Sequence, residues 1–129
     1  MTKYLGIDYG LAHIGLATSE HTLATPLPSL HNNKNLFSNL QSIVTQEGIT
    51  TIVCGIPDGV LAGKVEEFAD KLRTCTNIRV VLHQETLSSQ EAKHKLWQAG
   101  ASRSKKKDDH AYAACLILED FLELQNSVN

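Results

Sequence analysis

The chain has 129 residues, 42% of them hydrophobic, which is enough for one compact domain with its own core and too little length for two of ordinary size. Its formal net charge is −2, from 12 basic and 14 acidic residues, so overall charge gives no argument for nucleic-acid binding and any phosphate contact has to be local. No apolar run approaches the roughly 20 residues that cross a bilayer, and the N-terminal sequence lacks signal-peptide architecture. We therefore expect a cytoplasmic protein, and its length predicts a single domain over residues 1–129.

The first part of the chain predicts three antiparallel strands. Segments 4–7 and 14–18 are short and apolar, and the turn-like sequence between them indicates a hairpin. Segment 24–30 contains Pro26 and Pro28. Because proline cannot donate to a strand ladder, we expect this third strand at the edge of the sheet.

The remainder of the chain alternates between helices and strands. An apolar stripe at helical spacing predicts a helix from Leu36 to a C-cap at Gly48. Segments 50–55 and 78–82 are continuous apolar runs, and the first of them fits a central strand buried on both faces. The other predicted helices are one with an apolar stripe at Val65, Phe68, Ala69 and Leu72, one over 88–100, and a last one with a stripe at Ala113, Ala114, Ile117, Leu118, Phe121 and Leu122. This order predicts an α/β fold with a mixed five-stranded sheet, three antiparallel strands followed by parallel ones, flanked by helices.

The three cysteines are expected to be reduced packing residues. Cys54, Cys75 and Cys115 are odd in number and widely spaced. None belongs to a CxxC motif or to a Cys/His pair of zinc-binding type.

Two carboxylates stand close behind predicted strands. Asp8 ends the first strand within GIDYG, a position that suits a metal ligand, although an aspartate here can also cap the turn. Glu85 follows the strand 78–82 and precedes a helix for which Glu91 can complete a capping box. Glu85 is therefore either a functional carboxylate or an exposed loop residue.

The start of the last predicted helix offers a third candidate ligand. His110 lies on the inward face of this helix, since Ala114 and Ile117 fall within about 40° of it around the axis, whereas Asp109 lies at the margin. Alternatively, Asp109 complements the helix dipole and His110 is a half-buried polar residue. A parallel-centred sheet brings these groups and the two carboxylates to one edge, where divalent cations would neutralise them and support phosphodiester hydrolysis.

One local basic run stands just before this helix. It consists of Arg103, Lys105, Lys106 and Lys107. These residues either contact nucleic-acid phosphates or form a solvated loop.

Four segments of the chain resemble the YqgF/RuvX family of the ribonuclease H-like superfamily. They are LGIDYGLAHIGLATSE, TPL followed by IVCGIP, ETLSSQEA, and KKKDDHAYAACLILEDFL, and together they span nearly the whole chain. The resemblance implies a ribonuclease H-like fold and cleavage of structured nucleic acid that depends on Mn²⁺ or Mg²⁺. The implied roles are maturation of the 5′ end of precursor 16S rRNA or Holliday junction resolvase-like cleavage of branched DNA. Carried over by position, Asp8 and Glu85 match two acids of the family's active site.

The chain departs from the family pattern at three positions. His13 and Thr86 stand where family members usually have arginine, and the family's last catalytic aspartate aligns with His110, with Asp109 one position earlier. We therefore keep both His110 and Asp109 as candidate ligands and His13 as a candidate nucleic-acid contact beside the basic run.

These departures motivate a second hypothesis, a ribosome-assembly factor that binds nucleic acid and cleaves it poorly. An ATPase of the actin type is discounted because 129 residues cannot supply its second lobe. A resolvase needs a symmetric dimer to cut two strands, whereas a monomer can trim rRNA, so we expect a monomer or a weak homodimer.

Overall fold

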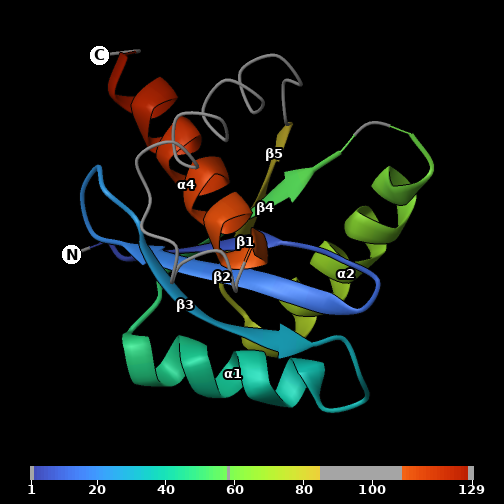
Figure 1. The fold of residues 1–129 in the computed structure, drawn as a ribbon. Coiled ribbons are helices and arrows are strands. Elements are labelled where there is room, and N and C mark those ends of the chain that lie inside the picture. Colours follow the sequence, from blue (N-terminus) through green and yellow to red (C-terminus); the bar gives the residue numbers. More distant parts are fainter. Residues whose placement is uncertain (1, 58, 85–108, 128–129) are drawn as a thin grey trace.

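The computed structural model describes residues 2–57, 59–84 and 109–127, which form one five-stranded sheet and three helices (Figure 1). The strands are β1 (Tyr4–Asp8), β2 (His13–Ser19), β3 (Thr25–His31), β4 (Thr51–Ile56) and β5 (Arg79–Gln84). The helices are α1 (Leu36–Glu47), α2 (Leu61–Thr76) and α4 (Asp109–Ser127). The helix expected over residues 88–100 lies outside the described residues.

The sheet has the mixed topology that the sequence predicts. Its strand order is β3-β2-β1-β4-β5, with antiparallel pairing among β1, β2 and β3 and parallel pairing of β4 with β1 and β5. The proline-containing strand β3 is at the edge, as expected. Each strand end lies within two residues of its predicted position, and β1 extends to Asp8 because that residue still pairs with Gly15 of β2.

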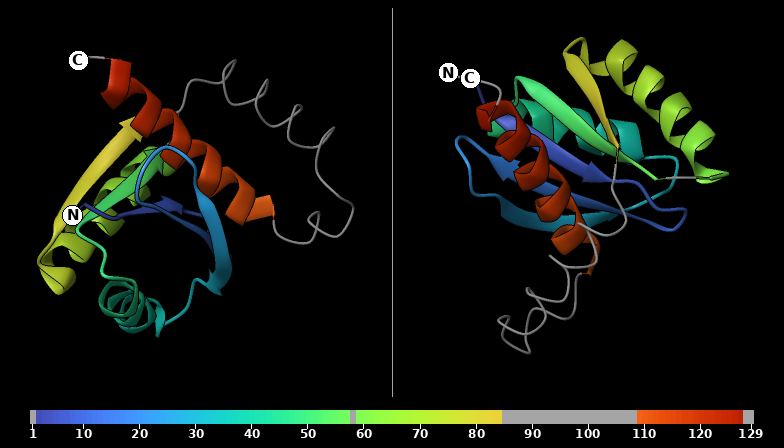
Figure 2. Two further views of the ribbon diagram at one scale, coloured as in Figure 1. Left: turned by 90° about the vertical axis from the view of Figure 1, so that its left-hand side faces the viewer. Right: turned by 90° about the horizontal axis from the view of Figure 1, so that it is seen from above.

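Helices cover both faces of the sheet. Helices α1 and α2 pack on one face and α4 packs on the other (Figures 1 and 2). On β1, Leu5 and Ile7 belong to the core beneath α1 and α2, while Gly6 lies against α4. Strand β4 is buried along almost its whole length, which confirms the two-sided burial that its apolar run predicts.

Local features of the elements also agree with the sequence. Helix α1 ends at Gly48, whose φ of 66° is left-handed and whose backbone N–H points at the carbonyls of Thr45 and Val44. Of the helices in the described part of the chain, none has a stretch both long and apolar enough to span a bilayer.

The three cysteines are free thiols. Cys54 and Cys115 are fully buried in the core, and Cys75 is partly buried. Burial raises the pKa of Cys54 to about 12, so this side chain stays an uncharged thiol and serves packing.

Candidate active site at the carboxyl end of β1

Asp8 stands at the end of the central strand of the sheet. Strand β1 lies between β2 and β4, and the backbone of Asp8 is paired with Gly15. Because side chains alternate along a strand, Asp8 faces the α4 side, as Gly6 does, whereas Ile7 and Tyr9 face α1 and α2. The strand therefore fixes the carboxylate at the sheet edge while its neighbours anchor the core.

The first turn of α4 brings His110 to Asp8. The distance between Nδ1 of His110 and Oδ2 of Asp8 is 3.6 Å, and the two side chains are 45% and 23% exposed. This separation is longer than a direct hydrogen bond. Burial raises the pKa of Asp8 and the neighbouring His110 partly opposes that rise, so the carboxylate is poorly solvated and would be stabilised by a nearby cation.

Two glycines allow α4 to lie directly on the sheet. A Cβ at Gly15 would overlap the carbonyl oxygen of His110, and one at Gly6 would lie 2.8 Å from Cβ of Leu118. Because Gly6 on β1 and Gly15 on β2 have no side chains, α4 can lie close enough to the sheet to bring His110 near Asp8. Sequence reasoning did not identify this role, although a glycine inside a strand pattern is a recognised signal of close backbone approach.

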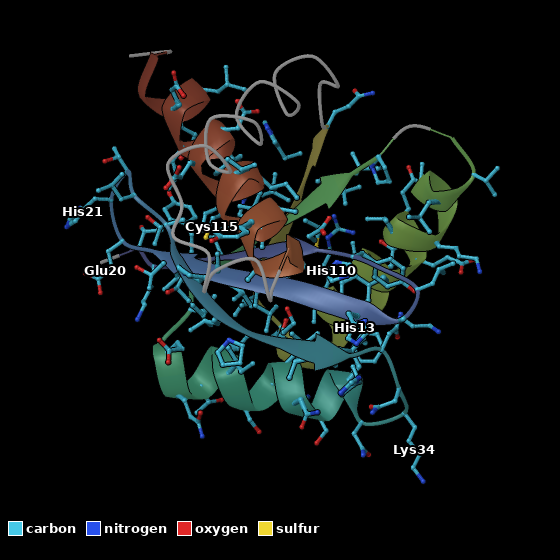
Figure 3. The ribbon with its side chains drawn as sticks, in the orientation of Figure 1. His13, Glu20, His21, Lys34, His110 and Cys115 are labelled. Atoms are coloured by element: carbon cyan, nitrogen blue, oxygen red, sulfur yellow. The ribbon has the colours of Figure 1, made fainter. Side chains whose placement is uncertain are left out.

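A row of imidazoles extends from His110 across the hairpin. The rings of His13 and His110 are stacked, with centroids 5.6 Å apart, and His13 also contacts His31, with centroids 5.0 Å apart. Figure 3 shows His13 and His110 together, far from Glu20 and His21 at the other end of the β2–β3 hairpin. Sequence reasoning included His13 and missed His31, which is its register partner on β3.

The other predicted site residues lie wholly or partly outside the described residues. Glu85, Thr86 and the basic run at 103–107 are outside them, and Asp109 is described only by its backbone, as the first residue of α4. Among the described side chains, no group of three or more histidine, cysteine, aspartate or glutamate residues is placed to hold a metal ion. Strand β5 ends at Gln84, and since it runs parallel to β1 it ends at the sheet edge that carries Asp8.

The sequence matches a known family over nearly its whole length. The RuvX model, described as Holliday junction resolvase, matches residues 2–124. A Chlamydia muridarum protein named "Putative pre-16S rRNA nuclease" is 33% identical over 134 residues, covering 93% of this chain and 90% of its own. A protein of the same name from Nitratidesulfovibrio vulgaris is 32% identical over 136 residues, covering 97% of this chain and 96% of its own. The chain belongs to the RuvX family.

Solved structures show the fold that this RuvX protein shares with resolvases. Thermus thermophilus RuvC in complex with a Holliday junction substrate superposes with a TM-score of 0.73 at 12% identity, covering 98% of this chain and 96% of that chain. The fowlpox virus Holliday junction resolvase gives a TM-score of 0.62 at 12% identity and covers 99% of this chain and 100% of that one. The expected ribonuclease H-like fold and the resemblance to YqgF/RuvX are confirmed. As a member of a nuclease family, the RuvX protein is a hydrolase that acts on phosphodiester bonds.

Proposed function

We propose that this RuvX protein is a metal-dependent nuclease that matures the 5′ end of precursor 16S rRNA. The observation that carries the proposal is the meeting of Asp8 and His110, from the central strand and the start of α4, at an accessible sheet edge. The names of the relatives from Chlamydia muridarum and Nitratidesulfovibrio vulgaris support the choice of substrate. Such a substrate would place the protein in the cytoplasm.

The donor set fits a divalent cation. Nucleases and resolvases of this fold generally use divalent metals. Asp8 offers a carboxylate whose burial makes a compensating cation favourable. The Nδ1 atom of His110 lies 3.6 Å from the Oδ2 atom of this carboxylate. Asp8 would hold the ion together with Glu85 and His110, and Asp109 is the alternative third ligand. When bound, the ion stabilises the negative charge that develops on the phosphate. We propose Mn²⁺ over Mg²⁺, because manganese accepts an imidazole ligand more readily.

Other groups of the chain are proposed to bind and orient the substrate. His13 is exposed and stacked on His110, so its free edge can donate to a phosphate oxygen next to the site. Arg103, Lys105, Lys106 and Lys107 supply local positive charge that the chain as a whole lacks. Cleavage itself is attack of water on phosphorus with departure of one ester oxygen.

A Holliday junction resolvase is the second candidate function, since that is the description of the matching family model. It requires a symmetric dimer that presents two sites to two strands, whereas end maturation of RNA is compatible with a monomer. A weakly active ribosome-assembly factor is the third candidate, favoured by the imidazoles at positions 13 and 110.

An activity assay with two substrates in parallel tests these proposals. We expect cleavage of a precursor 16S rRNA leader near its mature 5′ end, in the presence of Mn²⁺ and to a lesser degree Mg²⁺, and loss of cleavage with a chelator. Symmetric incision of a four-way DNA junction with an intact RNA leader would instead support the resolvase. Tight RNA binding that survives chelation, without cleavage in either metal, would support the assembly factor.

A further inference from the structure

A hollow opens close to Asp8, on the opposite face of the sheet. Its volume is about 290 Å³, near the lower end of the range for small-molecule sites. The turn after β1, the start of α1 and helix α2 form its walls, and these lie together in the right-hand half of Figure 1. The residues that define it chemically are Tyr9, Phe37, Lys64, Glu67, Phe68 and Lys71, which we call the α1–α2 pocket.

Its position links the pocket to the candidate active site. Tyr9 directly follows Asp8, and consecutive Cα atoms are about 3.8 Å apart. Since successive side chains alternate, Asp8 faces α4 and Tyr9 faces α2. A polynucleotide strand whose phosphate lies at Asp8 has only to cross this end of the sheet to reach the mouth of the pocket.

Aromatic rings form one wall of the pocket. Phe68 is buried, with 4% of its surface exposed, and its ring centroid is 4.9 Å from that of Tyr9 and 5.5 Å from that of Phe37. Tyr9 and Phe37 are only partly buried, so each keeps ring surface available in the pocket. Rings held in this way offer a stacking surface for an unpaired nucleobase.

Lysines form the other wall. Lys64 and Lys71 are exposed, and a spacing of seven residues places them on one face of α2. Neither forms an ion pair with another described residue. Glu67 lies between them, which leaves a local net charge of one positive in a chain whose total is −2. An ammonium group next to an aromatic surface fits the phosphate and base of one nucleotide.

We propose that the α1–α2 pocket binds an unpaired nucleotide of the substrate RNA next to the phosphodiester held at Asp8. The base stacks on Tyr9 and Phe37, and the phosphate contacts Lys64 and Lys71. A paired base keeps its faces inside the duplex, so the pocket selects substrates that are single-stranded beside the cleavage position. This inference rests on the proposed nuclease function and specifies the substrate of that site.

Binding in the absence of metal tests the proposal. The probes are three fluorescent RNAs with the same duplex: one with a single-stranded extension, one with the same extension lacking its bases, and one blunt. We expect the wild-type protein to bind the first at least about fivefold more tightly than the other two, the effect of losing one stacked base. We also expect K64A/K71A to weaken binding of the first RNA about tenfold by removing phosphate contacts.

Two charge variants serve as matched controls. Glu67→Gln removes the negative charge of the pocket and should tighten binding about twofold, opposite in sign to the lysine change. Arg79→Ala removes an exposed cation at the start of β5, the other end of the sheet, and should leave binding within about twofold of wild type.

Binding and cleavage measured on the same protein separate the pocket proposal from the proposed nuclease function. Suppose that the protein cleaves the precursor RNA when metal is present. Equal affinity for all three RNAs, or unchanged binding by K64A/K71A, would then overturn the pocket proposal and leave the nuclease function standing. A wild-type protein that neither binds nor cleaves any RNA would overturn the proposed function and the pocket with it.

Discussion

Asp8 is costly to ionise in the folded protein, because burial raises its pKa from the usual 3.8. A raised folded-state pKa means that the protonated group favours folding below the unfolded pKa, and that this contribution is lost as the pH rises through the folded value. At neutral pH without metal, the charged Asp8 therefore lowers stability. In the proposed metal site, a bound cation would neutralise this charge and remove its cost to stability.

Asp8→Asn is accordingly expected to melt a few degrees higher than wild type at pH 7 in a chelator. The difference should shrink as the pH falls and vanish near pH 3, where the carboxyl is protonated in both states. Thermal unfolding at both pH values measures this. A variant that melts at or below the wild-type temperature at pH 7 would show that Asp8 is stabilised by contacts other than a bound ion.

His110 and Asp109 compete for the role of third ligand, and the structure places the His110 imidazole beside Asp8. We predict that His110→Ala impairs cleavage more than Asp109→Asn does. We also predict that His110→Asp shifts the metal preference from Mn²⁺ towards Mg²⁺, since it replaces nitrogen by oxygen. Initial rates in titrations of both metals decide the point. Loss of activity in Asp109→Asn but not in His110→Ala would assign the ligand to Asp109.

At the scale of elements, the approach of α4 to β1 and β2 sets the geometry of the site. Gly15→Ala introduces a Cβ where the His110 backbone lies, so the first turn of α4 has to move. We expect a loss of about 1–3 kcal/mol in the free energy of unfolding and reduced cleavage.

Gly63→Ala is the matched control for this change. Gly63 lies in α2 with open space around its Cβ position, so the same substitution should raise stability by up to about 1 kcal/mol and leave cleavage unchanged. Denaturant unfolding and single-turnover rates of both variants provide the comparison. Equal effects of the two substitutions would show that α4 is not held by this contact.

The segment before α4 carries the basic run, and its contribution is predicted to be electrostatic. Replacing Lys105, Lys106 and Lys107 by alanine should weaken RNA binding and flatten its dependence on salt, because phosphate contacts release counterions. Replacing the same three by arginine keeps the charge and should keep the slope. An alanine variant with the wild-type salt dependence would assign the run to a solvated loop.

Elements were easier to predict than the contacts between them. Apolar runs and prolines predicted the strands of the sheet and the edge position of β3, because burial and ladder hydrogen bonding depend on local sequence. The proximity of Asp8 and His110 could also be predicted, because the order of strands and helices in this fold brings the end of β1 and the start of α4 to the same end of the sheet. The contact of His13 with His31 depends on hairpin register, and the Tyr9–Phe68 contact depends on how α2 packs on the sheet, which local patterns do not specify.

At the scale of the whole molecule, the fold limits the chemistry but leaves the substrate open. This chain shares its fold with resolvases at 12% identity, and function resides in the residues placed on a fold. Because the net charge is −2, we predict that RNA binding depends on local groups, at the carboxyl end of β1, in the basic run and in the α1–α2 pocket. Substrate choice is thus expected to change with these groups while the sheet stays intact.

We propose that metal-dependent cleavage takes place at Asp8, with Glu85 as its partner acid. Single-turnover cleavage of a precursor 16S rRNA leader in saturating Mn²⁺, by wild type, Asp8→Asn and Glu85→Gln, tests it most directly. Because each variant keeps the side-chain shape and removes one charge, we predict folded proteins with rates lowered by about two orders of magnitude or more. Rates close to wild type in either variant would show that cleavage does not take place at these two carboxylates.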